Sequence, residues 1–293
     1  MIRHRISTGH VSAVLALDED LDPTAAQALG PFLPGGWNLQ PSSAAAGTTD
    51  VEVTVGDAGI TGDMRTVRIR LPRCAADSNT LAYVTYTALE RARQHHRKVT
   101  VHATALHTPG GQSVLLFGAK GSGKTSTALA LAERGWTHAG DDLVVLGEYH
   151  EGVLAVWPGK PTAALRDQLQ PLAPKPQQAL EPFAAGPAPL GWTVRLAVHP
   201  RLATASLAPA TPLSVNERLR LHENLARYIA GLPTPLNGVD GMPYGPVWPL
   251  DTPDCARWRS HLIPRLADTR FDYLHAPNPE EAADLLAEEV QVR

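Results

Sequence analysis

The first part of the chain alternates between apolar and polar positions with the period of two that half-buried strands show. This pattern predicts strands at residues 50–55 and 64–71, and the mostly apolar run 11–17 predicts another. Separate capping signals predict two helices, at residues 22–33 and from Asp77 or Ser78 onwards. Residues 1–96 are therefore expected to form a small α/β domain.

The remaining residues, 97–293, also mix the two kinds of pattern. The alternating run 99–107, a Gly/Pro turn and the apolar run 113–117 predict an antiparallel hairpin. Further elements are predicted in alternation: helices at 125–134, 161–168, 214–230, 257–266 and 278–289, and strands at 135–146, 153–157, 193–198, 203–207 and 271–275. Two Pro-rich segments, 171–191 and 231–254, are expected to be a linker or lid and a long loop. The sequence thus predicts a second α/β domain.

A glycine-rich turn connects the apolar run 113–117 to the helix predicted from Thr125. Its sequence, Gly-Ala-Lys-Gly-Ser-Gly-Lys-Thr, fits the phosphate-binding motif G-x-x-x-x-G-K-[ST] at every specified position. In such a loop, backbone N–H groups and the positive end of the helix face the phosphates, Lys124 reaches the terminal phosphates, and the Thr125 hydroxyl binds Mg²⁺. A chance match is the alternative. The residues expected to bind the nucleotide are Gly118, Ala119, Lys120, Gly121, Ser122, Gly123, Lys124, Thr125 and Ser126.

Two adjacent acids, Asp141 and Asp142, interrupt the apolar run 135–146. Charges in such a run are costly unless they are paired or bound to metal. One carboxylate that faces the phosphates can hold Mg²⁺ together with the loop threonine. Neighbouring strand residues point to opposite faces, so a bend would be needed for the second to act as general base on an acceptor hydroxyl. The alternative is an exposed pair that caps a turn.

Composition and charge narrow the function classes. The chain has 293 residues, 43% of them hydrophobic and 19% charged, as in ordinary globular proteins. The net charge of −3 gives no electrostatic footprint for nucleic acid or an anionic membrane, so neither is expected as a partner. Cys74 and Cys255 lack the spacing of a zinc site or disulfide framework. The absence of a long apolar run or an apolar N-terminal segment favours a cytoplasmic protein.

The segment from His102 to Leu146 resembles the catalytic domain of HPr kinase/phosphorylase, whose core is similar to phosphoenolpyruvate (PEP) carboxykinase. The matching pieces, in order, are His102-Ala103, Gly110-Gly111, the apolar strand, the phosphate loop, Glu133-Arg134-Gly135 and Asp141-Asp142. The resemblance implies a PEP-carboxykinase-like P-loop kinase domain with a mixed sheet and flanking helices. It also implies ATP and Mg²⁺ as cofactors. Because HPr kinases are hexameric, it makes a homo-oligomer an expectation.

The same resemblance assigns roles to individual residues. His102 would lie near the transferred phosphoryl group, Asp141 would be the base, and Asp142 with Thr125 would coordinate Mg²⁺; Lys124 would also be catalytic. One more residue separates His102 from the loop than in the family pattern. His107 on the same predicted strand is therefore a rival, and an ordinary core or surface histidine is the other alternative.

The chain departs from the family in several respects. Its loop ends in Lys-Thr instead of Lys-Ser, the Gly-rich arginine segment of HPr kinases is not found, and the N-terminal unit differs. HPr is therefore not expected as the substrate. The chain is more similar to shorter relatives that phosphorylate free serine or a serine of a precursor peptide. Residues 157–166 resemble a Pro-Thr-x-x-x-Arg element of these relatives. Lys160, which precedes the element, and Arg166, its arginine, would meet phosphate or an acidic acceptor, or would be structural.

Taken together, these features predict an ATP- and Mg²⁺-dependent kinase. Its acceptor would be a hydroxyl of a small metabolite or of a peptide serine. The alternative is a nucleotide-binding regulatory module with little transferase activity.

Overall fold

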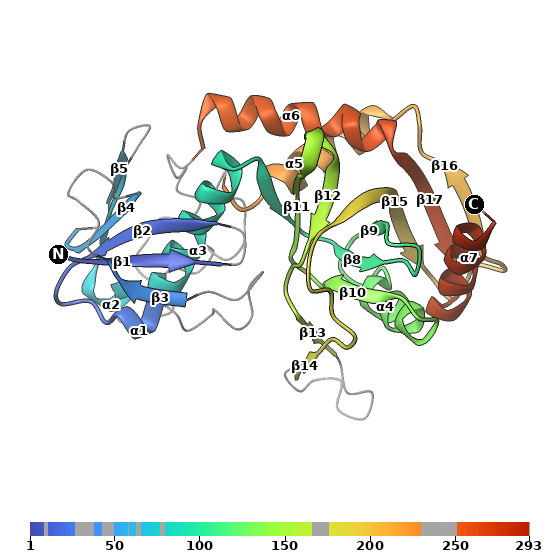
Figure 1. Ribbon diagram of the computed structural model, residues 1–293, viewed down its shortest axis with the longest axis horizontal. Helices are drawn as coiled ribbons and strands as arrows, with labels where there is room; N and C mark the ends of the chain where they lie inside the picture. Colours follow the sequence, from blue (N-terminus) through green and yellow to red (C-terminus); the bar gives the residue numbers. More distant parts are fainter. Residues whose placement is uncertain are drawn as a thin grey trace. The chain divides into compact units, whose positions relative to one another are not determined.

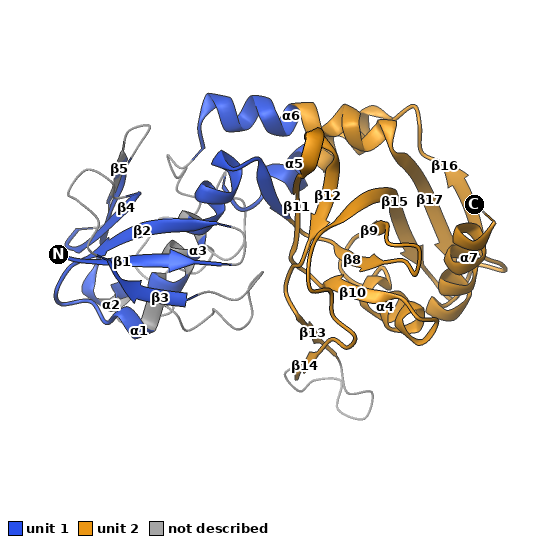
Figure 2. Ribbon diagram, viewed as in Figure 1, with its two compact units in different colours: residues 1–100, 222–260 blue, residues 101–221, 261–293 orange. Residues whose placement is uncertain are grey.

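The computed structural model describes residues 1–8, 11–26, 38–42, 50–57, 59–62, 66–76, 80–165, 176–229 and 251–292. The chain forms two compact units, coloured separately in Figure 2: unit 1 is Met1–Thr100 with His222–Ser260, and unit 2 is Val101–Leu221 with His261–Arg293. Figure 1 follows the chain through both units and labels their elements.

The division of the chain is less simple than a single boundary after residue 96. The first crossing lies close to that position, but residues 222–260 return to unit 1. Ile229 is fully buried in the apolar core of unit 1, and Arg259 donates a hydrogen bond to Gln94. These contacts join residues that are far apart in the sequence, so local periodicity gave no sign of them.

Unit 1 is built on one mixed sheet. Its described strands lie in the order β3 (Asn38–Pro41), β1 (Ile2–Ser7), β2 (Ser12–Leu17), β4 (Val51–Val55), β6 (Val67–Leu71) and β5 (Gly59–Gly62). β4 is parallel to β2 and β6, and the other pairs are antiparallel. Alternate strand residues such as Leu15 and Ile69 form an apolar core with Leu81 and Leu89 of α3 (Thr80–His95). The strands expected at 11–17, 50–55 and 64–71 match β2, β4 and β6, whereas β1 was not predicted.

Two short helices complete the described part of unit 1: α1 (Pro23–Ala26) and α2 (Arg73–Ala76). The rest of the helix predicted at 22–33 lies outside the described residues. So does most of the loop predicted at 231–254, since α6 already begins at Pro253. β7 (Lys98–Val101) then leads the chain from unit 1 into unit 2.

Unit 2 is built on a curled mixed sheet. Six of its strands follow the order β10 (Thr137–Gly140), β8 (Thr104–His107), β9 (Ser113–Phe117), β15 (Ala188–Val198), β12 (Leu154–Trp157) and β11 (Val144–Glu148). β15 also pairs in parallel with β17 (Arg270–Ala276), which pairs with β16 (Ser206–Pro209). β9 is parallel to β15 and buried along its whole length, as its uninterrupted apolar sequence predicts.

Two helices of unit 2, α4 (Lys124–Glu133) and α7 (Pro279–Gln291), pack on the same face of this sheet. Their apolar residues form one core with Val114 and Leu116 of β9 and with Val194 and Leu196 of β15. α5 (Val215–Ala226) and α6 (Pro253–Asp268) each run from one unit into the other along the chain. No helix in the described ranges is both long and apolar enough to cross a membrane.

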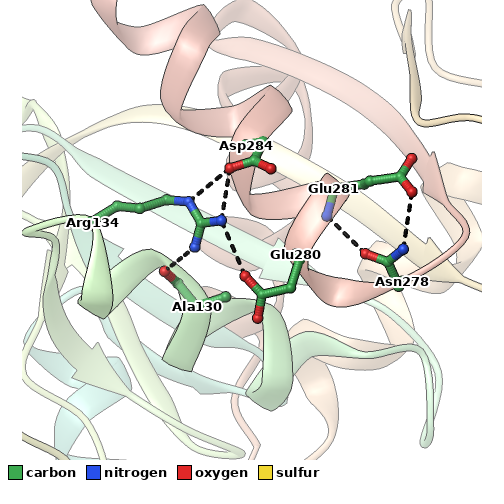
Figure 3. Close-up of polar contacts among 6 residues, drawn as sticks. All are labelled: Ala130, Arg134, Asn278, Glu280, Glu281 and Asp284. Carbon is green, nitrogen blue, oxygen red and sulfur yellow. Dashed lines mark hydrogen bonds and ion pairs between the residues drawn. The ribbon is translucent and has the colours of Figure 1, made fainter.

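Side-chain contacts fix the two helices on each other (Figure 3). Arg134 at the C-terminal end of α4 donates to Asp284 at 2.7 and 2.9 Å and to Glu280 at 3.0 Å. Asn278 caps α7 by accepting a hydrogen bond from the backbone N–H of Glu281. The end of α4 distant from the glycine-rich turn is therefore anchored to α7.

Three predicted elements of unit 2 need correction. The strands expected at 99–107 and 135–146 are each interrupted, the first at His102-Ala103 and the second at Asp141-Asp142-Leu143. The helix expected at 161–168 is wrong within the described residues, because Thr162–Ala164 form β13 and pair with β14 (Gln177–Ala179). Pairing between strands outweighs the helix propensity of a short Ala-rich run. β14 also occupies part of the predicted linker.

Candidate functional site

The glycine-rich turn lies between β9 and α4, the structural setting that the phosphate-loop motif requires. Gly123 has φ 89°, and a Cβ at this position would lie 2.6 Å from Cγ2 of Val198. Only glycine therefore fits here without strain. Val198 N donates to Ser122 O at 3.0 Å. The end of β15 thus fixes the backbone of the turn.

Lys124 turns its side chain back into the loop. Its Nζ donates to the carbonyl oxygens of Gly118 at 2.9 Å and Ala119 at 3.1 Å. Burial lowers the pKa of this ammonium group, while the charges of Asp142 and Asp141 raise it. The Oγ of Ser122 is buried and has no hydrogen-bond partner among the described residues. The loop therefore presents an ammonium group and a free hydroxyl, both suited to phosphate oxygens.

Thr125 and Asp141 meet directly. The Thr125 hydroxyl donates to the carboxylate, with distances of 3.0 Å to Oδ1 and 3.1 Å to Oδ2. From β8, the hydroxyl of Thr104 donates to Oδ1 at 2.5 Å. Asp141 is only 2% exposed, and burial raises its pKa against the effect of these two hydrogen bonds. The structure thus brings the loop threonine to Asp141 and not to Asp142.

Asp142 points elsewhere because the chain turns after Asp141. It has φ 63°, a left-handed conformation that is uncommon for residues other than glycine. Its side chain is 47% exposed, and Oδ2 lies 3.9 Å from the Nζ of the nearly buried Lys160. The two acids therefore have different surroundings, one closed and one open to solvent. The bend that adjacent acids need in order to act separately is present.

Backbone contacts hold Lys160 at this turn. Lys160 N donates to Leu143 O at 2.8 Å, and Asp141 N donates to Lys160 O at 3.2 Å. Gly159 N donates to Ala139 O at 2.6 Å, and a Cβ on Gly159 would lie only 2.2 Å from Leu143 O. Hydrogen bonds therefore join residues 159–160, which precede β13, to the turn that carries both acids.

The two candidate histidines have different positions. His102 is half-buried in the bend before β8, two residues ahead of Thr104. His107 lies at the other end of β8, opposite Ser113, the first residue of β9. It is therefore separated from the loop by the length of β9, about 13 Å at the usual rise per strand residue. His102 lies toward the end of β9 from which the loop begins, whereas His107 lies at the opposite end. The catalytic role of His102 stays a prediction.

Two site residues were not found from the sequence: Thr104 and Arg195. Arg195 lies on β15 beside Phe117, the last residue of β9, with its Cζ 5.2 Å from the Phe117 ring centroid. Its charge contributes to the lowered pKa of Lys124. The sequence could have indicated Arg195 as a candidate site residue, because a charge interrupts the apolar run 193–198. Thr104 could not have been found in this way, because a threonine at the start of a strand is common.

The oxygen atoms of the site suit magnesium. Within the described part of the chain, no group of three or more His, Cys, Asp or Glu residues is able to hold a metal. Thr125 and Asp141 instead offer a hydroxyl and a carboxylate. Mg²⁺ in nucleotide sites is usually held by one or two such protein groups together with phosphates and water. The residues fit that arrangement.

Comparisons with known proteins add little. No family model and no curated protein matches the chain. A solved structure of the Hpr(Ser) kinase/phosphatase from Coxiella burnetii is similar, with a TM-score of 0.27 and 19% identity over 39% of this chain and 72% of that chain. A TM-score of this size does not establish a shared fold.

Proposed function

We propose that the protein is an ATP- and Mg²⁺-dependent kinase that phosphorylates a hydroxyl group. The observation that carries this proposal is the meeting of Thr125 with the buried Asp141, beside a phosphate loop whose Lys124 already points inward. Bound Mg²⁺ would neutralise charge on the phosphates. The acceptor is a small hydroxylated metabolite or a peptide serine.

The geometry favours an exchange of the roles inferred from sequence for the two acids. Asp141, which accepts from Thr125, would hold Mg²⁺ together with that hydroxyl. Asp142, which is half exposed and next to Lys160, would face the acceptor. The acceptor oxygen would form a bond to the γ-phosphorus of ATP as the bond to the β,γ-bridging oxygen breaks. Asp142 would take the hydroxyl proton, and ADP would leave.

Lys124 and Lys160 would stabilise negative charge at two different places in the site. Lys124 would contact the terminal phosphates from inside the loop. Lys160 would stabilise negative charge next to Asp142. Both are largely buried, so their charges are weakly screened by solvent and act strongly on a bound anion. This preorganised charge would supply most of the rate enhancement.

Phosphoryl transfer tests the proposal directly. The purified chain would be incubated with Mg²⁺ and ATP and with pools of hydroxylated metabolites and serine peptides, and products would be followed by mass spectrometry. We expect one acceptor class to gain a phosphoryl group, and Lys124→Ala to abolish that gain. Arg218→Gln, which removes an exposed charge of α5, is the matched control and should retain it.

The second candidate, a regulatory nucleotide-binding module, would give a different result. ATP would bind in a Lys124-dependent manner, but no acceptor from any pool would be labelled. That outcome would contradict the kinase proposal. Failure of the wild-type chain to bind any nucleotide would contradict both candidates.

A further inference from the structure

The pair formed by Arg195 and Glu217 is a largely buried ion pair close to the phosphate loop. Arg195 donates from Nε to Glu217 Oε1 at 3.1 Å, and one of its terminal nitrogens makes a second, shorter contact with the same oxygen. The side chains are 14% and 1% exposed. Burying such a pair is costly and is weak evidence for a contribution to stability, so its position calls for another explanation.

Glu217 does not have the contacts that its sequence position predicts. Ser214 and Glu217 have the spacing of a capping box, in which the glutamate would bond back to the backbone of the serine. The serine half is present, because Ser214 Oγ accepts from Glu217 N at 3.1 Å. The carboxylate instead holds Arg195, and its Oε2 is buried without a hydrogen-bond partner in the described ranges. The Glu217 carboxylate therefore binds Arg195 and does not cap its own helix.

The orientation of Arg195 leaves part of its guanidinium group available. Glu217 occupies Nε and one terminal nitrogen, and the ring of Phe117 lies against one side. The other terminal nitrogen makes no hydrogen bond or ion pair with the described residues and is not among the buried polar atoms that lack a partner. A planar guanidinium fixed along one edge presents its remaining N–H groups in a defined direction.

We infer that Glu217 is a positioning residue that directs Arg195 toward the terminal phosphate of the bound nucleotide. This inference rests on the proposed function. Arg195 lies on the strand next to β9, level with the residue before the loop, and its charge acts on Lys124. ATP carries a negatively charged γ-phosphate at the end of its phosphate chain, and ADP has no charge at that position. Arg195 would therefore distinguish ATP from ADP, and Glu217 would act only through Arg195.

Equilibrium binding tests this without knowledge of the acceptor. The affinities for ADP and for the β,γ-imido analogue of ATP would be measured with Mg²⁺ for wild type, Arg195→Gln, Glu217→Gln and the double variant. Arg195→Gln should weaken binding of the ATP analogue about tenfold or more, as expected for a lost charged hydrogen bond, and leave ADP binding nearly unchanged. Glu217→Gln should give a smaller loss of the same kind. The double variant should be no weaker than Arg195→Gln alone.

The outcomes separate this inference from the proposed function. If wild type binds nucleotide but Arg195→Gln weakens both ligands equally, or the two single effects add in the double variant, the inference is wrong and the kinase proposal is untouched. If wild type binds neither nucleotide, both are wrong. Arg195→Lys, which keeps the charge without the planar geometry, should lose part of the discrimination and provides the test should Arg195→Gln not fold. Arg218→Gln should behave as wild type.

Discussion

Glu90 in unit 1 and Asp141 in unit 2 are both buried carboxylates whose pKa is raised by burial, yet their partners differ. Glu90 is 0% exposed and accepts from the backbone N–H of Thr100 at 3.0 Å and the amide of Gln94 at 3.0 Å, with Arg93 at 3.6 Å. Asp141 accepts from two hydroxyls.

The different partners of Glu90 and Asp141 indicate different roles for the two carboxylates. Glu90 lies beside the cationic Arg93 and accepts from a backbone N–H and an amide as well as from the side chain of Thr100, so most of its partners are donors that cannot bind a metal in its place. Hydroxyls can rotate, and their oxygens can bind a metal. A buried carboxylate surrounded by hydroxyls beside a phosphate loop is therefore prepared to exchange partners. Glu90 is expected to serve stability and Asp141 to serve chemistry.

The largest expected contrast is in phosphoryl transfer. Asp141→Asn should lower the transfer rate about 10- to 100-fold, as loss of a group that supports a metal does. Glu90→Gln, the matched change in unit 1, should leave the rate within about twofold, since the contacts of Glu90 are with Arg93, Gln94 and Thr100 and not with the residues assigned to the site. Steady-state assays with Mg²⁺ and ATP would measure both. Equal losses of transfer rate in Asp141→Asn and Glu90→Gln would contradict the separate roles given to the two carboxylates.

The reverse contrast is expected in stability. Glu90→Ala should lower the free energy of unfolding by about 3 kcal/mol, because it removes the carboxylate from its buried ion pair with Arg93 and from its hydrogen bonds to Thr100 and Gln94. Asp141→Asn keeps a shape that both hydroxyls can contact and should change stability much less. Urea denaturation of both variants would show this. A larger loss for Asp141→Asn would mean that Asp141 is the structural residue.

A smaller effect should follow removal of one hydroxyl. Thr104→Val keeps the shape of the side chain but leaves Asp141 with one partner fewer. We expect a cost of about 1–2 kcal/mol in unfolding free energy, the usual range for a buried acceptor that loses a hydrogen bond. Thr104→Ser retains the hydroxyl and should recover most of it. If both variants are equally destabilised, the methyl group and not the hydrogen bond is responsible.

The smallest effect concerns pH. Burial raises the pKa of Asp141 above its ordinary value of 3.8, so the folded protein binds the proton more tightly than the unfolded chain. Its contribution to stability is therefore present below that pH and lost as pH rises through the raised pKa. Asp141→Asn lacks this titration. Without Mg²⁺, the stability of wild type relative to Asp141→Asn should fall with rising pH; a constant difference would contradict the shift.

The sequence predicted the parts of the site that are continuous in the chain. The strand, turn and helix around Lys124 follow from one motif and one apolar run, and Asp141-Asp142 stand out because charges interrupt an apolar stretch. Contacts between distant segments were not predictable in this way. Thr104 and Arg195 reach the site through strand pairing, and Glu217 of α5 contacts Arg195 from a distant part of the sequence. The left-handed turn at Asp142 has no local signature.

The same limit explains the errors in the fold. Local propensity favoured a helix at 161–168, where pairing with β14 gives a strand. It could not show that residues 222–260 return to the core of unit 1.

The most direct test of the account is the effect of Mg²⁺ on ATP affinity, measured by titration calorimetry for wild type, Asp141→Asn and Glu90→Gln. We predict that Mg²⁺ strengthens ATP binding to wild type and to Glu90→Gln by similar factors, and that Asp141→Asn loses most of this gain. An undiminished gain in Asp141→Asn, or no ATP binding by wild type, would contradict the assignment of this site to Mg²⁺-dependent phosphoryl transfer.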